Sequence, residues 1–133
     1  MHASDGYVHW DETLLSGAEI LRRARDLIAF GWCQQADATD ANHDPVEPWS
    51  ARACHWSLLG ALAAALGPPC NDTPESPALI AELRLALLAI SEQIPDWSLQ
   101  QWNDHPQRTQ AGVAAMLTTA HEQWHAATAD DRP

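Results

Sequence analysis

Apolar residues recur every three or four positions between Pro77 and Pro95, and this spacing limits the possible fold more than any other feature of the sequence. Side chains with this spacing lie on one face of an α-helix. Proline suits the first turn of a helix, as at Pro77, and Pro95 would end it. We therefore predict a helix over residues 77–94 that forms the centre of the hydrophobic core. Its buried face would consist of Ile80, Leu83, Leu87, Ile90 and Ile94, widened by Leu79, Ala86 and Leu88.

A helix is also predicted over residues 16–30, because its start carries a capping box. In this motif the Ser16 hydroxyl accepts a hydrogen bond from the Glu19 amide, and the Glu19 carboxylate reaches back to Ser16. Leu15 and Ile20 are placed to pack together around the first turn. Gly31 can end the helix in a left-handed conformation. The buried face would be Ile20, Ala24, Leu27 and Ile28, with Arg22, Arg23 and Asp26 on the other sides.

Two further helices are predicted from Ser50 and Thr109, whose hydroxyl groups are suited to capping a first turn. The helix after Ser50 would run to Leu66, before a Gly-Pro-Pro stop, and would bury Cys54. Its small residues, including Gly60, would let a neighbouring helix approach closely. The helix after Thr109 would bury Val113, Met116, Leu117, Ala120, Trp124 and Ala127.

No segment alternates between polar and apolar residues as a half-buried strand does, so we predict an all-α protein. The architecture would be a compact bundle of four main helices, with a short helical turn at 96–101 and a long acidic loop at 33–49. A chain of 133 residues fits one domain. We expect a single helical domain over 1–133, with flexible ends at 1–12 and 128–133.

The acidic composition narrows the classes of partner. The chain has 18 acidic residues, seven arginines and no lysine, and its net charge is −11. Nucleic-acid binding relies on basic residues that neutralise phosphates, and anionic membranes attract basic segments. Purely apolar runs such as residues 61–66 are also far too short to cross a bilayer. We therefore expect no direct nucleic-acid binding and no membrane binding.

The three cysteines, Cys33, Cys54 and Cys70, favour a reducing compartment. A disulfide framework would favour an even number of cysteines. The first ten residues also lack the cationic start and apolar core of a secretory signal. We therefore expect a cytoplasmic protein. On a helix, Cys54 and His55 would point about 100° apart, so they could not easily bind one metal ion together.

Three segments with characteristic residues follow one another along the chain. They are GWCQ at 31–34, CHWSLLGAL at 54–62, and WND at 102–104 followed by Arg108, Thr109 and Val113. Together they resemble an uncharacterised family of small bacterial and phage-borne proteins, known mainly as a domain of unknown function, over about residues 14–120. The resemblance implies one compact helical domain and supplies no activity. This chain has Ser57 where the family would have cysteine, which weakens a catalytic role for a cysteine there.

The segment His121-Glu122-Gln123-Trp124-His125 matches the pattern H-E-x-x-H, in which two histidines bind zinc and a glutamate activates water. A zinc-dependent hydrolase, with His121 and His125 as metal ligands and Glu122 as the catalytic residue, is therefore the alternative function. Only eight residues follow His125 to supply a third ligand, and no sheet is predicted to hold a substrate. A helical wheel also places Glu122 on the solvated side, opposite Trp124. We therefore expect no catalytic site, metal or cofactor.

The segment around Trp102 is the other candidate site. Trp and Arg are favoured at the centres of protein interfaces. Trp97 and Trp102 would be apolar anchors and Arg108 a polar contact, with Asn103 and Asp104 between them. The structural alternative is a turn in which Asn103 and Asp104 satisfy backbone donors. In that turn Trp102 would fill the edge of the core and Arg108 would pair with Asp104.

We therefore expect a small acidic interaction or regulatory protein rather than an enzyme. An inhibitor encoded by a phage or mobile element is one such protein. Its partner would be a protein with a basic surface, which the acidic loop at 33–49 would meet.

Overall fold

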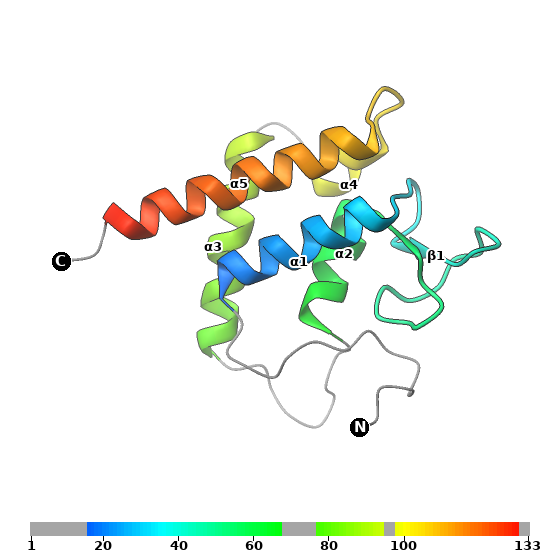
Figure 1. Ribbon diagram of the computed structural model, residues 1–133, viewed down its shortest axis with the longest axis horizontal. Coiled ribbons are helices and arrows are strands. Elements are labelled where there is room, and N and C mark those ends of the chain that lie inside the picture. Colours follow the sequence, from blue (N-terminus) through cyan, green and yellow to red (C-terminus); the bar gives the residue numbers. More distant parts are fainter. Residues whose placement is uncertain (1–15, 68–76, 95–97, 131–133) are drawn as a thin grey trace.

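The computed structural model describes residues 16–67, 77–94 and 98–130, apart from the side chains of 77–80 and 125–130. Helices make up most of the described structure, and the expectation of a mainly helical protein is confirmed. Leu15, Cys70, Trp97 and the expected flexible end at 1–12 lie outside the described residues, whereas 128–130 belong to the last helix. The helices are α1 (Gly17–Phe30), α2 (Leu58–Leu66), α3 (Pro77–Gln93), α4 (Leu99–Asp104) and α5 (Gln110–Asp130) (Figure 1).

A small antiparallel sheet corrects the expectation that the chain contains no strands. Strand β1 (Ala38–Thr39) pairs with β2 (His55–Trp56), so that Ala38 lies opposite Trp56 and Thr39 opposite His55. Each strand has two residues, which is too short for the alternating pattern that reveals a strand in a sequence. The sheet fixes the acidic loop (residues 33–49) against the chain that leads into α2.

Helix α1, and not α3 as predicted, lies at the centre of the fold. It contacts α2, α3 and α5, and Figure 1 shows it antiparallel to the long helix α5. Ile90 of α3 and Ile94, which directly follows the helix, are buried as predicted, but Leu88 is 61% exposed. Because α3 packs mainly against α1 and α5, part of its apolar surface stays outside the core. The residues of α1 that are completely buried are Ile20, Leu21, Ala24 and Ile28.

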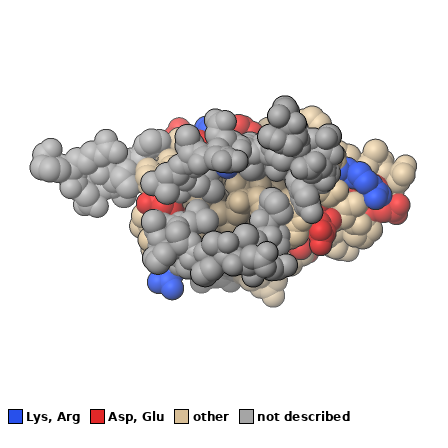
Figure 2. All heavy atoms as spheres, turned by 90° about the horizontal axis from the view of Figure 1, so that it is seen from below, with Lys and Arg blue, Asp and Glu red and all other residues tan. Residues whose placement is uncertain are grey.

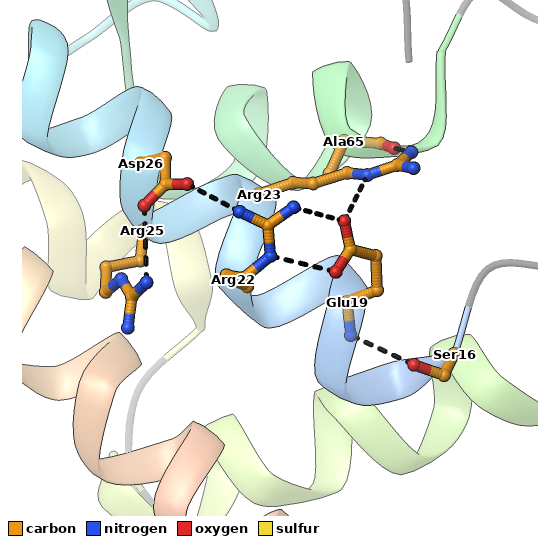
Figure 3. A network of polar contacts seen from close by, with 7 residues as sticks. All are labelled: Ser16, Glu19, Arg22, Arg23, Arg25, Asp26 and Ala65. Atoms are coloured by element: carbon orange, nitrogen blue, oxygen red, sulfur yellow. Dashed lines mark hydrogen bonds and ion pairs between the residues drawn. The ribbon is translucent and has the colours of Figure 1, made fainter. Parts of the chain in front are cut away.

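Half of the predicted capping box is formed at the start of α1. Ser16 Oγ accepts a hydrogen bond from Glu19 N at 3.1 Å. Instead of returning to Ser16, the Glu19 carboxylate accepts hydrogen bonds from Arg22 and Arg23 (Figure 3). Charged donors bind a carboxylate more strongly than a single neutral amide does. At the other end of α1, Gly31 is extended, with φ −168°, and not left-handed as predicted.

Arg23 is buried, contrary to its predicted place outside the apolar face of α1. Only 4% of the residue is exposed, and its Nη1 donates a hydrogen bond to Ala65 O at 3.2 Å. Ala65 lies in the last turn of α2, where carbonyl groups lack helical partners and a cation is favoured. Arg23 therefore joins the middle of α1 to the end of α2. The hydrogen bond from Arg22, together with the bond and charge of Arg23, lowers the pKa of Glu19 to about 2.

Helix α2 begins at Leu58, and the predicted start at Ser50 is wrong. Ser57 Oγ caps the helix by accepting a hydrogen bond from Gly60 N at 3.0 Å. The family resemblance led us to expect a cysteine at this position. A serine oxygen is the better cap, because a thiol sulfur is a weak hydrogen-bond acceptor.

Residues 50–57 stay out of α2 because their backbone groups bind elsewhere. Cys54 N donates a hydrogen bond to Thr39 O at 2.9 Å, and Trp56 N donates to Gly31 O at 3.0 Å. Cys54 and His55 therefore lie in non-helical chain, and the angular separation predicted for helical neighbours does not apply to them.

We predicted that Gly60 would pack against a neighbouring helix. It packs instead against the backbone of the acidic loop. The Asp37 carbonyl accepts a hydrogen bond from Ser57 N at 3.1 Å and lies directly over Gly60. A Cβ atom at position 60 would overlap this carbonyl oxygen. Glycine is therefore required here because the acidic loop crosses the first turn of α2.

Helix α5 buries the predicted face. Thr109 Oγ1 accepts a hydrogen bond from Gly112 N at 3.0 Å, as expected of a cap. Trp124 is half-buried and packs against the core, whereas the side chain of Ala127 lies outside the described residues. In the part of the chain that the structure describes, no helix is long and apolar enough to cross a membrane. The buried residues of this face are Val113, Met116, Leu117 and Ala120.

We expect Gly60→Ala to lower the free energy of unfolding by about 3 kcal/mol, because the acidic loop must move away from the new methyl group. Gly112→Ala on α5 is the matched control, because only Thr109 Oγ1 lies near its Cβ position, at 3.1 Å. Alanine favours a helix, so the control should be neutral or more stable by up to about 1 kcal/mol. Urea unfolding measures both values, and equal stabilities of the two variants would contradict the close approach at Gly60.

We expect Glu19→Gln to reduce the pH dependence of stability. A carboxylate with a lowered pKa stabilises the fold above the pKa of the unfolded chain, near 4.5, and this contribution is lost as the pH falls toward 2. Between about pH 6 and pH 2 the wild type should lose about 1 kcal/mol more than the variant, because the carboxylate is partly solvated. Urea unfolding across this range tests the expectation. Parallel pH profiles would show that Glu19 does not have this role.

Candidate functional site

The three sequence motifs meet at the side chain of Asn103, near the end of α4. Its Oδ1 accepts hydrogen bonds from Trp32 Nε1 at 2.8 Å and from Leu58 N at 2.9 Å. Its Nδ2 donates to Cys33 O at 3.1 Å and to Asp104 Oδ1 at 3.0 Å. Asn103 is 0% exposed, so the hydrogen bonds of its amide are all made within the protein. One side chain therefore connects the acidic loop, the start of α2 and α4.

Gln34 and Asp104 strengthen the same connection. Gln34 Nε2 donates hydrogen bonds to Asn103 O at 3.0 Å and to His105 O at 2.9 Å. Asp104 Oδ1 accepts from Gln35 N at 2.8 Å, where Gln35 has a positive φ of 65°. The start of the acidic loop is therefore held against the end of α4. We call this set the Asn103 junction; it comprises Trp32, Gln34, Leu58, Asn103 and Asp104.

Trp102 and Arg108 contact each other. Trp102 is 8% exposed, and the Arg108 guanidinium lies 3.9 Å from the centroid of its ring. Arg108 Nε also donates a hydrogen bond to Trp102 O at 2.8 Å. None of the ion pairs among the described residues joins Arg108 to Asp104, the partner that the structural alternative predicted. Trp102 and Asn103 are both buried, and Trp97 lies outside the described residues.

Asp40 shapes the tip of the acidic loop. Its Oδ1 accepts hydrogen bonds from Asn42 N at 2.9 Å and Asp44 N at 3.0 Å, and its Oδ2 pairs with Arg52 at 2.8 Å. The bond from the Asp44 backbone, followed by the bond from Arg52, holds the pKa of Asp40 below its usual value. A hollow of about 300 Å³ is bordered by Asp40, Ala41, Asn42 and Arg52. The Asp40 carboxylate therefore orders the loop.

The exposed carboxylates of the acidic loop have no arginine partner among the described residues. Asp37, Asp44 and Glu47 are exposed, and none of them belongs to an ion pair in this part of the chain. The arginines of α1 pair with carboxylates of that same helix. Figure 2 shows acidic and basic side chains at the right-hand end of the molecule, where this loop lies. The basic side chain of Arg52 is already paired with Asp40, so the loop keeps a negative charge.

Phe30 is the most exposed large apolar side chain among the described residues, at 74%. It ends α1, and its ring centroid lies 6.1 Å from that of Trp56 in an edge arrangement with an interplanar angle of 61°. Trp56 is 3% exposed, and its Nε1 donates a hydrogen bond to Pro48 O at 2.8 Å. A buried, hydrogen-bonded ring therefore supports Phe30 beside the acidic loop.

Helix α5 carries the residues of the alternative zinc site. Glu122 is exposed and His121 is half-buried, whereas the side chain of His125 lies outside the described residues. The described residues include no group of three or more His, Cys, Asp or Glu side chains placed to hold a metal ion. The zinc-dependent hydrolase stays a prediction.

A family model supplies the identification. The model of a family of unknown function, DUF6197, matches residues 13–123. The chain belongs to the DUF6197 family. The match includes the acidic loop and the Asn103 junction, and it agrees with the uncharacterised domain expected from the three motifs. No curated protein and no solved structure matches the chain.

Sequence reasoning missed three features of this DUF6197 domain. Gln34 belongs to the GWCQ segment, but nothing in the segment shows that its side chain reaches two carbonyl groups of a distant turn. Phe30 does not belong to the apolar stripe predicted for residues 16–30. Its position outside the stripe could have indicated that this aromatic side chain is exposed. The pairing of Thr39 with His55 depends on a strand register, and strands of two residues are too short to be recognised in a sequence.

We expect Asn103→Asp to destabilise the DUF6197 domain by about 3 kcal/mol or more. The substitution replaces the Nδ2 donor with an oxygen that faces Cys33 O and the Asp104 carboxylate, and it buries an unpaired negative charge. Gln101→Glu adds the same charge on the exposed side of the same helix and should change stability by less than about 0.5 kcal/mol. Urea unfolding compares the two. Equal losses would mean that the added charge, and not the junction, is responsible.

Proposed function

We propose that the protein is a small acidic regulatory protein that binds another protein with a basic surface. The observation that carries this proposal is the exposed Phe30 ring, which packs against Trp56, whose Nε1 in turn donates a hydrogen bond to Pro48 O of the acidic loop. Interfaces often have an aromatic anchor at their centre and polar groups at their rim. We place the contact at Phe30, Asp37, Asp44 and Glu47, and call this set the Phe30 face.

The distribution of charge favours a basic partner over a neutral one. The whole chain has a net charge of −11, and the arginines on α1 pair with carboxylates of that helix. The negative potential of the acidic loop is therefore not neutralised nearby. A basic protein would be attracted over a distance of about 8 Å at physiological salt, and this attraction would raise the rate of encounter.

The internal bonds of the acidic loop support its use as a binding surface. Its backbone is held by the β1–β2 pair, by the hydrogen bonds of Asp40 and by the Asn103 junction. A loop that is ordered before binding loses less conformational entropy when a partner binds. The supported position of Phe30 has the same advantage.

The finer proposal is an inhibitor or regulator that is encoded by a phage or mobile element and acts in the cytoplasm. The two described cysteines, Cys33 and Cys54, are free thiols, as suits a reducing compartment. A basic protein of the same compartment would be the target.

We expect neutralisation of the acidic loop to slow association with the partner. Affinity capture from a lysate of the source organism supplies the partner, which is then purified for biosensor kinetics between about 0.05 and 0.5 M salt. Asp44→Asn with Glu47→Gln removes two negative charges and keeps the backbone bond from Asp44 to Asp40. This variant should associate several-fold more slowly at low salt and show a weaker salt dependence, with little change in dissociation.

Two further variants make this test specific. Glu92→Gln with Glu122→Gln removes the same charge from exposed positions on α3 and α5 and should leave association unchanged. Phe30→Ala should speed dissociation about 30-fold, equivalent to about 2 kcal/mol, while the melting temperature stays near that of the wild type. Equal slowing by both charge variants, or unchanged dissociation of Phe30→Ala, would show that the Phe30 face is not the contact.

A further inference from the structure

We propose that Cys54, with His55 beside it, is a reactive thiol that exchanges with small-molecule disulfides. Cys54 Sγ lies 3.7 Å from His55 Nδ1, within contact distance for a sulfur and an imidazole nitrogen. Both residues are half-buried, so a small reagent has access to part of each side chain. The site lies outside the Phe30 face, and the inference does not rest on the proposed function.

The strand pairing holds the imidazole of His55 in place. His55 lies opposite Thr39 in the sheet, and Thr39 Oγ1 is 3.0 Å from His55 Nδ1. The ring of His43 stacks on the His55 ring, with centroids 5.1 Å apart and planes 15° apart. The strand register and the stacked ring of His43 together fix the plane of the imidazole, so that Nδ1 stays within reach of Cys54.

A thiol beside an imidazole can act as a nucleophile, because the thiolate and not the thiol attacks an electrophile. The Cys54 proton passes to His55 Nδ1, and the sulfur attacks one sulfur of the disulfide. A bond forms between Cys54 Sγ and that sulfur while the original disulfide bond breaks. The departing thiolate takes the proton from His55. One protein thiol and one disulfide thus give one mixed disulfide and one free thiol.

Cys33 is an internal reference for this chemistry. Burial raises the pKa of the Cys33 thiol, and the negative charges of Asp104 and Asp37 add to the increase, against a hydrogen bond from Thr39. Cys33 Sγ also donates a hydrogen bond to Ala36 O at 3.5 Å. Because its thiolate is disfavoured, Cys33 should react more slowly than Cys54.

Thr39 competes with Cys54 for the same nitrogen, and this competition gives a second test. When the hydroxyl bonds to Nδ1, the imidazole is less available to the thiol proton. Thr39→Val removes the hydroxyl and keeps the branched shape of the side chain. Of the two described contacts of His55 Nδ1, only the one with the Cys54 thiol then remains.

The experiment uses full-length protein and 4,4′-dithiodipyridine, a small uncharged disulfide whose released thiol is measured by absorbance. Cys33→Ser with Cys70→Ser leaves Cys54 as the single thiol, and Cys54→Ser with Cys70→Ser leaves Cys33. At pH 7 a thiol with an ordinary pKa of about 8.5 is about 3% ionised, so a neighbouring base can raise the rate by up to about 30-fold. We expect the Cys54 protein to react at least about 10-fold faster than the Cys33 protein, with the mixed disulfide located at Cys54 by mass spectrometry.

His55→Gln and Thr39→Val are then added to the protein that retains Cys54. His55→Gln should slow the reaction about fivefold at pH 7, and the two rates should converge at about pH 10, where any thiol of ordinary pKa is ionised. Thr39→Val should react at least as fast as its parent. The other ionisable groups near this site, His43 and the Asp40–Arg52 pair, are the same in all these variants.

Circular dichroism separates this effect from unfolding, which would expose the thiol and raise its rate. The proposal is overturned if Cys54 reacts no faster than Cys33, or if folded His55→Gln reacts as fast as its parent at pH 7. A slower reaction of folded Thr39→Val would equally show that His55 does not act on the Cys54 proton.

Discussion

The buried amide of Asn103 connects the acidic loop, the start of α2 and the end of α4, which no helix or strand pairing joins directly to one another. Its four hydrogen bonds end on a tryptophan side chain, two backbone groups and a neighbouring carboxylate. Each of these groups would cost about 1–3 kcal/mol if it were buried without a partner. The acidic loop therefore has its shape only when α4 is in place. The Phe30 face and the Cys54 thiol both lie in or beside the segments that the Asn103 amide binds, which are the start of the acidic loop and the start of α2.

The hydrophobic core and the polar connections meet in α1. Gly17 N, at the start of this helix, donates a hydrogen bond to Glu82 Oε1 of α3 at 2.7 Å. At the end, Gly31 O accepts from Trp56 N, which belongs to the small sheet. Between these points the apolar face of α1 is buried. A displacement of α3 or α5 would therefore move the base of the acidic loop as well as the core.

The sequence predicts those parts of the fold that depend on local patterns. The stripes of α1, α3 and α5 and the caps at Ser16 and Thr109 are such patterns. The start of α2 was misplaced because Ser50 and Ser57 are equally suitable caps, and hydrogen bonds to Thr39 and Gly31 decide between them.

The errors at longer range have a common cause. The burial of Arg23 depends on the position of Ala65, and the roles of Asn103 and Gln34 depend on groups about 70 residues away. The central place of α1 likewise depends on which helices pack against which. Periodicity reports which side of a helix is apolar, but it does not report which helix covers that side.

The order of the chain gives the Asn103 junction a consequence for folding during synthesis. Leu58, Cys33 and Trp32 precede Asn103 by 45, 70 and 71 positions, so they leave the ribosome long before their partner does. Until then the Leu58 amide and the Trp32 indole must be hydrated, and strands of two residues are not stable alone. Contacts between distant residues also form slowly, because a long loop must close first. The nascent chain would therefore carry an unfinished N-terminal half, open to chaperones and proteases, until the short helix α4 emerges and completes it.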